Sequence, residues 1–247
     1  MQVERVPFLS ATRFHNEYLD VRPVVVTAMT AKWPARTTFT PERFANELGD
    51  VELTLRRYAG DSEETFLVQT AHTTRHTSLR AWMQAASGAQ PYDDSVKAWS
   101  VRESQELFFK VPKLVEELDF AGLFPRGHKR FEHYLWLGPP GYTTGLHTDE
   151  VAVNLLAHFV GHKTVTLFDP AQTELLYPET RESVQDGLYS AVNVMAPDLA
   201  KHPGFARAQP IIAELEPGDL LYIPRGWWHW VRGHDLCISV GGVSHTA

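Results

Sequence analysis

The sequence contains a single cysteine, Cys237, among 247 residues, and this scarcity excludes two kinds of site. One cysteine cannot form an intrachain disulfide, and it cannot supply the several thiolates of a structural zinc site. Any metal bound by this chain is therefore expected to have nitrogen and oxygen ligands. The scarcity of cysteine is also typical of a reducing compartment, and we expect a cytoplasmic protein.

Long apolar runs and basic clusters are missing as well. No apolar run approaches the roughly 18 residues of a membrane-spanning helix, and Met1 to Ser10 lack the pattern of a secretory signal. The net charge is -7 without a run of Lys and Arg, so we expect neither a membrane nor a nucleic-acid partner. An acidic surface suits a basic substrate, although charge that only keeps the surface soluble explains it equally well.

The composition that remains is typical of a folded globular protein. Hydrophobic residues make up 43% of the chain, charged residues 21% and aromatic residues 11%. The sequence has no internal repeat, low-complexity tract or linker. We therefore expect one domain over 1–247, in which 1–130 supply flanking helices and strands and 131–247 form the catalytic core.

The two parts of the chain differ in their secondary-structure signals. Residues 1–130 mix strands predicted at 6–9, 23–26 and 51–55 with helices predicted at 40–48, 78–86 and 111–118. From Tyr134 onward the predicted elements are short strands at 134–138, 151–160, 164–168, 211–215, 220–223, 227–231 and 237–240. Gly- and Pro-containing turns at 138–141 and 216–219 separate some of these strands, which predicts a sandwich or a barrel.

His147 and Asp149 are the first candidate metal ligands. Two residues apart on a strand, they would point to the same face and could share one ion. In a chain with 12 histidines such a pair also arises by accident, as a strand-end histidine bonded to an aspartate. The segment from Gly218 to His229 favours a metal site over a chance pair. Its tight turn, apolar strand and Pro-x-Gly kink would bring the imidazole of His229 into the interior.

Two histidines and one carboxylate make up the facial triad of non-haem iron(II) oxygenases, which leaves coordination positions open. Redox-inert zinc is the chief competitor, because these ligands also suit a hydrolytic zinc ion. A cosubstrate pocket favours iron: Thr144, Asn154 and Lys163 place a hydroxyl, an amide and an ammonium where they could converge on a dicarboxylate. A solvated lysine at a strand edge is the alternative for Lys163.

These motifs, in order and spacing, resemble the JmjC-type, cupin-like family of Fe(II)- and 2-oxoglutarate-dependent oxygenases. The matching segments lie at 22–25, 32–34, 136–139, 147–149, 154, 161–163, 176–178, 217–219 and 223–229. Within the family the chain is more similar to the small arginyl and asparaginyl hydroxylases than to histone demethylases. The resemblance covers essentially the whole chain and implies a mainly β fold, a double-stranded β-helix of jelly-roll type with flanking helices.

The resemblance also implies the site and the reaction. It assigns the iron to His147, Asp149 and His229, and the 2-oxoglutarate contacts to Thr144, Asn154 and Lys163. The implied reaction consumes 2-oxoglutarate and dioxygen and hydroxylates an amino-acid side chain in a protein, a peptide or an amino-acid-derived small molecule. A metal-binding, cupin-like sensor without oxygenase activity and a JmjC-type demethylase remain as alternatives.

Two segments depart from the family pattern. A tyrosine that reaches 2-oxoglutarate in several relatives has no match at 99–102, and an amide near the end is replaced in the Val-Gly-Gly-Val of 240–243. These two contacts are therefore not carried over. The chain stops at Ala247, without the C-terminal helices by which some relatives dimerise, and we expect a monomer.

The substrate is the least determined part of the prediction. Tyr134, Trp136 and Trp228 are candidates to line its pocket, although aromatic residues more commonly pack in a core. Glu150 and the acidic stretch 61–64 could receive a basic side chain, or could be ordinary loop charges.

Four further histidines are interpreted without a catalytic role. His72 and His76 lack the glutamate of the metalloprotease motif, which disfavours a zinc hydrolase, and we interpret them as loop histidines. His158 and His162 are expected to be structural or surface histidines.

Overall fold

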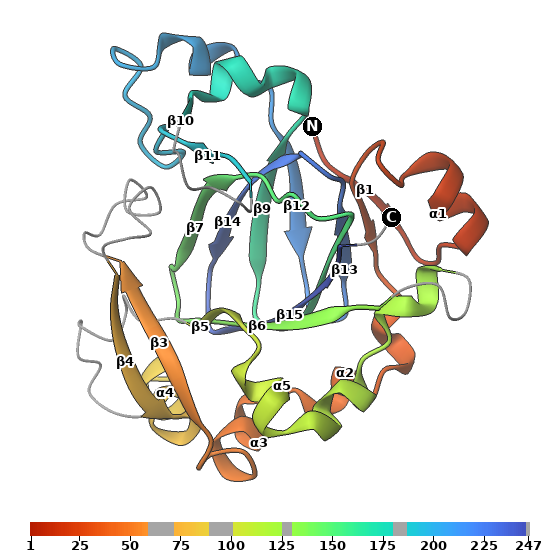
Figure 1. The fold of residues 1–247 in the computed structure, drawn as a ribbon, viewed down its shortest axis with the longest axis vertical. Helices are drawn as coiled ribbons and strands as arrows, with labels where there is room; N and C mark the ends of the chain where they lie inside the picture. Colours follow the sequence, from red (N-terminus) through yellow and green to blue (C-terminus); the bar gives the residue numbers. More distant parts are fainter. Residues whose placement is uncertain (59–71, 89–100, 125–129, 180–186, 246–247) are drawn as a thin grey trace.

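Two β-sheets pack face to face and form the centre of the molecule (Figure 1). The computed structural model describes residues 1–58, 72–88, 101–124, 130–179 and 187–245. The core strands are β6 (Glu132–Gly138), β7 (Thr143–His147), β8 (Val153–Val160), β9 (Lys163–Phe168), β12 (Ile211–Leu215), β13 (Leu220–Ile223), β14 (Trp228–Gly233) and β15 (Cys237–Ser244).

The connections between these strands define a jelly roll. One sheet has the order β1-β2-β13-β8-β15-β6-β5, and the other has the order β10-β11-β7-β14-β9-β12. The chain changes sheet after β6, β7 and β8, and again after β12, β13 and β14, and the core strands pair antiparallel. The predicted fold class, a mainly β protein with a double-stranded β-helix core and flanking helices, is therefore confirmed.

Additional strands extend the two sheets and form a separate hairpin. They are β1 (Glu4–Val6), β2 (Val24–Val26), β5 (Val101–Ser104), β10 (Pro178–Glu179) and β11 (Tyr189–Ser190), with β3 (Glu52–Tyr58) and β4 (His72–Ser78) paired as the hairpin. The predicted strand at 6–9 is wrong beyond Val6. Pro7 lacks the N–H that a continued strand would need, and the chain leaves the sheet there.

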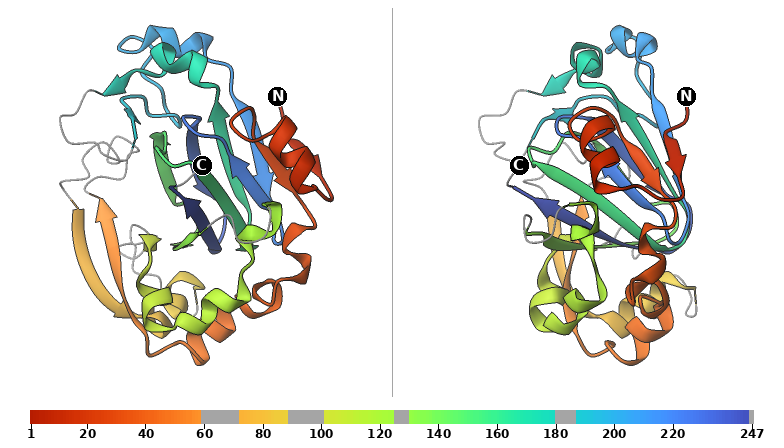
Figure 2. Two further views of the ribbon diagram at one scale, coloured as in Figure 1. Left: turned by 45° about the vertical axis from the view of Figure 1, so that its right-hand side comes forward. Right: turned by 90° about the vertical axis from the view of Figure 1, so that its right-hand side faces the viewer.

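Short helices flank the barrel. They are α1 (Ala11–Glu17), α2 (Ala35–Thr38), α3 (Pro41–Asn46), α4 (Leu79–Ala86) and α5 (Glu106–Lys110), with 3₁₀ helices η1 (Met29–Lys32), η3 (Pro112–Glu117), η4 (Phe120–Leu123), η5 (Pro170–Leu176) and η6 (Pro203–Arg207). Thr40 caps α3 and Ser78 caps α4 through their hydroxyl oxygens. The segment predicted as a helix at 111–118 is the 3₁₀ helix η3. Figure 2 shows α3, α4 and α5 gathered with the β3–β4 hairpin below the barrel.

Apolar side chains pack in three layers. The layer between the sheets contains Leu156, Val165, Leu167, Leu221 and Val231. A larger layer joins the outer face of the seven-stranded sheet to the helices, and a smaller one, with Trp228 and Trp230, covers the outer face of the six-stranded sheet. Side chains that point between the sheets are therefore in a mostly apolar interior, where a buried polar group is costly unless it has a hydrogen-bond partner or a bound ligand.

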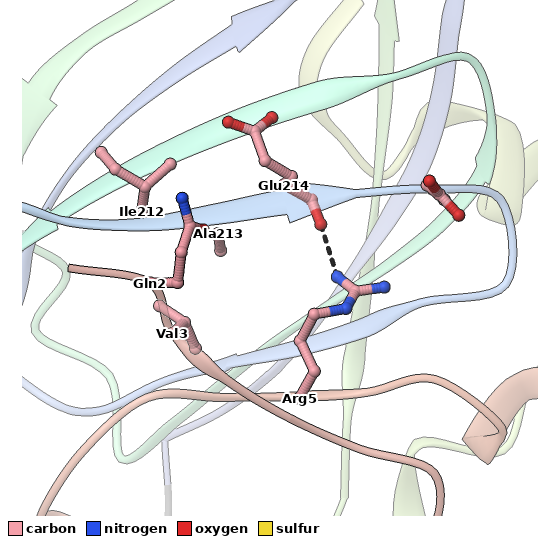
Figure 3. A pocket seen from close by; sticks show the side chains of 7 residues that line it. Gln2, Val3, Arg5, Ile212, Ala213 and Glu214 are labelled. Carbon is pink, nitrogen blue, oxygen red and sulfur yellow. Dashed lines mark hydrogen bonds between the residues drawn. The ribbon is translucent and has the colours of Figure 1, made fainter.

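The free edge of β12 is covered by the first residues of the chain. The Val3 amide donates to the Ile212 carbonyl at 2.8 Å, and the Ile212 amide donates to the Met1 carbonyl at 2.9 Å. A pocket of about 370 Å³ lies along this edge, where Arg5 donates to the carbonyl oxygen of Glu214 (Figure 3). No helix within the described ranges is long and apolar enough to cross a membrane.

Candidate metal centre

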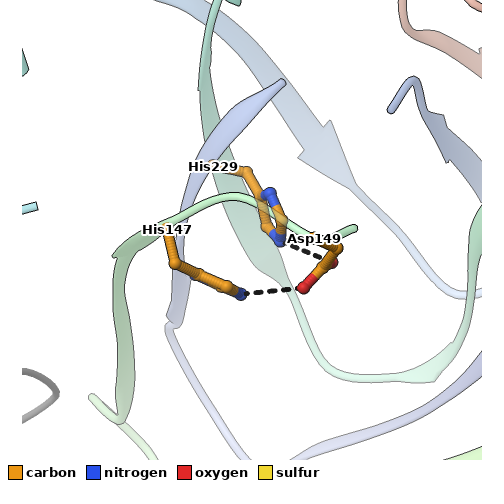
Figure 4. A group of neighbouring side chains, drawn as sticks. All are labelled: His147, Asp149 and His229. Atoms are coloured by element: carbon orange, nitrogen blue, oxygen red, sulfur yellow. Dashed lines mark ion pairs between the residues drawn. The ribbon is translucent and has the colours of Figure 1, made fainter. Parts of the chain in front are cut away.

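Three side chains meet inside the barrel, two from neighbouring strands and one from a loop (Figure 4). Nε2 of His147 lies 3.7 Å from Oδ1 of Asp149, and Nε2 of His229 lies 3.4 Å from Oδ2 of the same carboxylate. The three candidate ligand atoms all lie within 4.8 Å of one another. The structure therefore brings together the residues that the sequence predicted as ligands, in a group that could hold a metal ion.

A β-bulge in β7 gives this strand its inward-facing residues. His147 lies opposite His229, and Thr144 lies opposite Val231, so β7 takes three steps where β14 takes two. On a regular strand, residues three apart point to opposite faces, but the extra residue lets both Thr144 and His147 face the interior. The bulge thus places a hydroxyl on the same side of the sheet as the two imidazoles.

Asp149 differs from its predicted position, because β7 ends at His147 and the carboxylate stands in the loop that follows. Two hydrogen bonds fix this loop: the Thr148 amide donates to the Leu188 carbonyl, and the Leu188 amide donates to the Thr148 hydroxyl, both at 2.9 Å. Asn154 Nδ2 then donates to Oδ2 of Asp149 at 2.6 Å. The amide predicted to contact 2-oxoglutarate therefore orients the carboxylate.

The hydrogen bonds of the two histidines select the tautomer that a metal needs. Nδ1 of His147 lies 2.7 Å from the Gly145 carbonyl, and Nδ1 of His229 lies 3.2 Å from the Trp227 carbonyl. A carbonyl oxygen only accepts, so the Nδ1 atoms carry the protons and the Nε2 atoms are left as ligands. Such carbonyl partners orient metal-binding imidazoles in proteins.

The charges at the three residues are strongly coupled. Burial, together with the charge of His229, lowers the pKa of His147 to about 4. Burial raises the pKa of Asp149, but the two histidines and Asn154 outweigh it and lower that pKa to about 2. Burial lowers the pKa of His229, while Asp149 outweighs burial and raises it. The carboxylate is thus kept ionised and His147 neutral, the forms in which both bind metals.

Lys163 faces the same interior as the three candidate ligands. On β9, Leu167 lies opposite His229, and Lys163 and Val165 share the face of Leu167 because they are four and two residues away. At about 3.3 Å per residue, the Cα of Lys163 is roughly 13 Å along the strand from the His229 row. Thr144, opposite Val231, lies in the row between the two, so Thr144 and Lys163 lie on the same interior face.

The ammonium of Lys163 is buried without an acidic partner in the described part of the chain. Its side chain is 2% exposed, and Nζ donates to Oγ of Ser239 at 2.7 Å and lies 5.5 Å from the centre of the Tyr142 ring. Burial lowers the pKa of Lys163 to about 8. The alternative of a solvated edge lysine is thus excluded by its burial, and a buried cation of this kind suits an anionic ligand.

Two tyrosines near the site have no counterpart in the sequence prediction. Tyr142 packs over the two glycines Gly138 and Gly233, where a Cβ atom would lie 1.9 Å and 2.3 Å from its ring. Tyr189 pairs with His147 across β11 and β7, and its ring stacks on the imidazole with centroids 6.0 Å apart. The Gly-Tyr sequence at 141–142 is a turn signal, and nothing in it indicated a ring beside Lys163.

The missing family amide is explained by the packing around Gly241. A Cβ atom at Gly241 would lie 3.3 Å from Nε1 of Trp136, so the indole occupies the space into which a larger side chain would project. Tyr134 lies opposite Gly241, and Trp136 opposite Ser239, so both aromatic residues point inward from β6. The other departure, at 99–102, lies partly outside the described residues.

The remaining substrate candidates differ in their placement. Glu150 is exposed and follows Asp149 directly in the loop after β7. Trp228 is fully buried on the outer face, because adjacent residues on a strand point to opposite sides, and its Nε1 donates to Thr173 at 2.9 Å. Trp228 therefore packs in a core layer and is not retained as a substrate contact. The acidic stretch 61–64 lies outside the described residues.

His158 and His162 take the structural and surface places expected of them, whereas His72 and His76, expected in a loop, lie on strand β4, which pairs with β3. His158 is fully buried and hydrogen-bonded to Ser239 and to the Gly161 carbonyl. His162 is exposed and pairs with Asp235. His76 lies 3.3 Å from the Thr54 hydroxyl on the β3–β4 hairpin.

Comparisons with known proteins identify the family to which the chain belongs. The model of the cupin-like domain family matches residues 11–241. The chain is 30% identical to lysine-specific demethylase 8 of Danio rerio over 97% of this chain and 57% of that protein. It is 28% identical to HSPB1-associated protein 1 of Bos taurus (87% and 46%) and 27% identical to lysine-specific demethylase JMJ30 of Arabidopsis thaliana (97% and 54%).

The chain spans about half the length of the curated relatives it matches. The family match, by contrast, covers nearly the whole chain, including all eight strands of the jelly roll up to Gly241. The chain therefore belongs to the cupin-like, JmjC-type domain family.

Proposed function

We propose that this protein is an Fe(II)- and 2-oxoglutarate-dependent dioxygenase that hydroxylates an amino-acid side chain in a protein, a peptide or an amino-acid-derived small molecule. The observation that carries the proposal is a shared interior face. His147, His229 and Lys163 lie on neighbouring strands of one sheet and face its interior, Asp149 joins the two histidines from the adjoining loop, and buried Lys163 has no acidic partner among the described residues. A hydrolytic zinc site needs the two histidines and the carboxylate but has no use for the buried ammonium.

The residues present fit both groups. His147, Asp149 and His229 would hold the metal on one side, which leaves open positions for an oxo acid and dioxygen. Lys163 would bind the distal carboxylate of 2-oxoglutarate, with Thr144 beside it. When bound, Fe(II) and 2-oxoglutarate supply the activation of dioxygen that hydroxylation requires. The apolar layer between the sheets, including Leu167 and Val231, keeps water from this space.

The proposed substrate is a side chain in a protein, a peptide or an amino-acid-derived small molecule, and a basic side chain is favoured. The names of the relatives, two demethylases of lysine and a protein associated with HSPB1, support a protein substrate. Exposed Glu150 next to Asp149, with inward Tyr134 and Trp136, offers a carboxylate and aromatic faces for a cation. Demethylation is the second candidate, and the same names favour it.

The direct test is loss of the metal and of turnover in His147→Ala and Asp149→Ala. We expect both variants to purify without iron and to form no succinate from 2-oxoglutarate, since each loses one of three ligands. His15→Ala, which removes an exposed histidine on α1, is the matched control and should behave as the wild type. Normal succinate formation by His147→Ala would show that the ligand assignment is wrong.

A spectroscopic experiment separates an oxygenase from a metal-binding sensor. Anaerobic addition of Fe(II) and 2-oxoglutarate to an oxygenase of this kind gives a magenta charge-transfer band. The band should appear in the wild type and not in Asp149→Ala. If the wild type binds Fe(II) without the band and without 2-oxoglutarate, the sensor alternative is favoured.

A further inference from the structure

Three buried side chains form a hydrogen-bonded chain that joins the two sheets. Nζ of Lys163 donates to Oγ of Ser239 at 2.7 Å, and that oxygen lies 2.8 Å from Nδ1 of His158. Nε2 of His158 lies 2.8 Å from the carbonyl oxygen of Gly161. The side chains are at most 2% exposed. Ser239 and His158 come from paired strands of one sheet, and Lys163 comes from the opposite sheet.

The donor and acceptor of each of these hydrogen bonds follow from the Gly161 carbonyl at the end of the series. The Gly161 carbonyl can only accept, so the proton of a neutral His158 is on Nε2, and Nδ1 is an acceptor. The Ser239 hydroxyl must then donate to Nδ1. Its lone pairs remain for the ammonium of Lys163, which can only donate. The hydroxyl is therefore fixed in the one orientation that receives a lysine.

The same imidazole fixes the backbone from which Lys163 starts. Gly161 forms the turn between β8 and β9 and has a φ of +83°, which favours glycine. Its carbonyl is held by His158, and Lys163 begins β9 two residues later. His158 thus constrains both the main chain of Lys163, through the turn, and its ammonium, through Ser239.

The hydrogen-bonded side chains hold the ammonium of Lys163 without neutralising its positive charge. Burial and the charge of Lys163 lower the pKa of His158 to about 3, so the imidazole stays neutral. Ser239 is neutral as well, and an ammonium has three N–H donors, of which one donates to Ser239 and the other two have no hydrogen-bond acceptor among the described residues. Two donors and a full positive charge remain for a ligand in the interior.

We propose that Ser239 and His158 are positioning residues that hold Lys163 in place for the distal carboxylate of 2-oxoglutarate. The inference rests on the proposed function and deepens it, because it assigns two further residues to the cosubstrate site. A tethered cation loses less freedom on binding than a free lysine side chain, and the difference raises affinity. The effect is confined to ligands that carry the distal carboxylate.

The test measures binding by anaerobic calorimetry with Mn(II) as the metal, so that it needs no turnover. Ser239→Ala removes the acceptor, and we expect about tenfold weaker binding of 2-oxoglutarate, the size of one hydrogen bond to a charged group. Binding of 2-oxopentanoate, which has the same length but lacks the distal carboxylate, should not change. Ser239→Thr keeps the hydroxyl and should restore the affinity. Ser244→Ala, a buried serine on the other face of β15, is the control.

A double-mutant cycle tests whether Ser239 influences 2-oxoglutarate binding through Lys163. In a Lys163→Met background, Ser239→Ala should have no further effect on 2-oxoglutarate binding. An unchanged affinity in Ser239→Ala, or an equal loss for both oxo acids, would overturn the positioning role while leaving the proposed function intact. Failure of the wild type itself to bind 2-oxoglutarate would instead overturn the proposed function, and this inference with it.

A second measurement needs no variant and remains informative if Ser239→Ala does not fold. In ¹⁵N-histidine spectra of the wild type, His158 should be the neutral Nε2–H tautomer from pH 5.5 to pH 8. A ring that carries its proton on Nδ1, or that is protonated in this range, would break the chain of donors and refute the proposal.

Discussion

Lys163→Met should stabilise the protein while it strongly weakens cosubstrate binding. A lysine whose pKa falls from 10.5 to about 8 costs the folded state about 3 kcal/mol in its charged form. Methionine fills similar space without a charge. It leaves the Ser239 oxygen without the Lys163 donor, which costs about 1 kcal/mol. The net gain at pH 7 is about 2 kcal/mol, which raises the melting temperature by about 4–8 °C for a chain of this size.

The stability difference between Lys163→Met and the wild type should depend on pH, because the folded and unfolded chains release the Lys163 proton at different pH values. Between about pH 8 and pH 10.5 the unfolded chain binds a proton that folded Lys163 has released, so the stability of the wild type rises with pH in this window. Below pH 8 the penalty is fully present. The advantage of Lys163→Met should therefore shrink from about 2 kcal/mol at pH 7 to less than about 1 kcal/mol at pH 10.

Urea unfolding of both proteins at the two pH values is the assay, and Lys32→Met, which changes an exposed lysine on η1, is the control. Saturating metal and 2-oxoglutarate should reverse the order, because ligand at 100 times its Kd stabilises the wild type by about 2.7 kcal/mol and the variant hardly at all. A Lys163→Met protein that is less stable than the wild type at pH 7 would show that the ammonium is not desolvated at a cost.

Three other predictions follow from the site. Asn154→Ala should weaken metal binding by about 10–100-fold, since the amide orients Asp149, whereas Asn46→Ala on the surface of α3 should not; equal metal affinity in both variants would contradict the orienting role. Gly233→Ala should cost about 1–3 kcal/mol because its Cβ would lie 2.3 Å from the Tyr142 ring, and an unchanged urea midpoint would show that the ring moves freely. Incubation with Arg- and Lys-containing peptides should add one oxygen atom by mass spectrometry; release of formaldehyde would indicate demethylation, and no reaction with any basic substrate would remove the preference for basic side chains.

The barrel could be predicted from sequence because its strands are short apolar runs between Gly and Pro turns. Each of the seven strands predicted from Tyr134 onward is present in the structure. Nearly all of their predicted ends lie within two residues of the observed ends, and those of β12 and β13 coincide with them. Among the eight core strands, the one that was not predicted is β7, whose Thr-Thr-Gly sequence at 143–145 lacks an apolar pattern. It carries His147, so the element least visible in the sequence bears a candidate ligand.

The candidate site was predicted from residue types, while its supporting contacts were not. The pairing of His147 with His229 requires a β-bulge, and a bulge depends on the register between distant strands, which local sequence does not encode. The same holds for Ser239, which looks like any strand serine until β9 brings Lys163 against it. Trp228, by contrast, is a sequence candidate for the substrate pocket, but it alternates with inward-facing His229 and packs on the outer face of the six-stranded sheet.

The pairing of the first residues with β12 also bears on how the protein behaves in solution. An uncovered strand at the rim of a sheet is a template on which another copy can add a strand. Here Met1 to Val3 occupy that template at Ile212. Shortening the chain by a few residues at its start would expose the row of amides and carbonyls, and soluble protein would then be lost to self-association even though every residue of the metal centre was untouched.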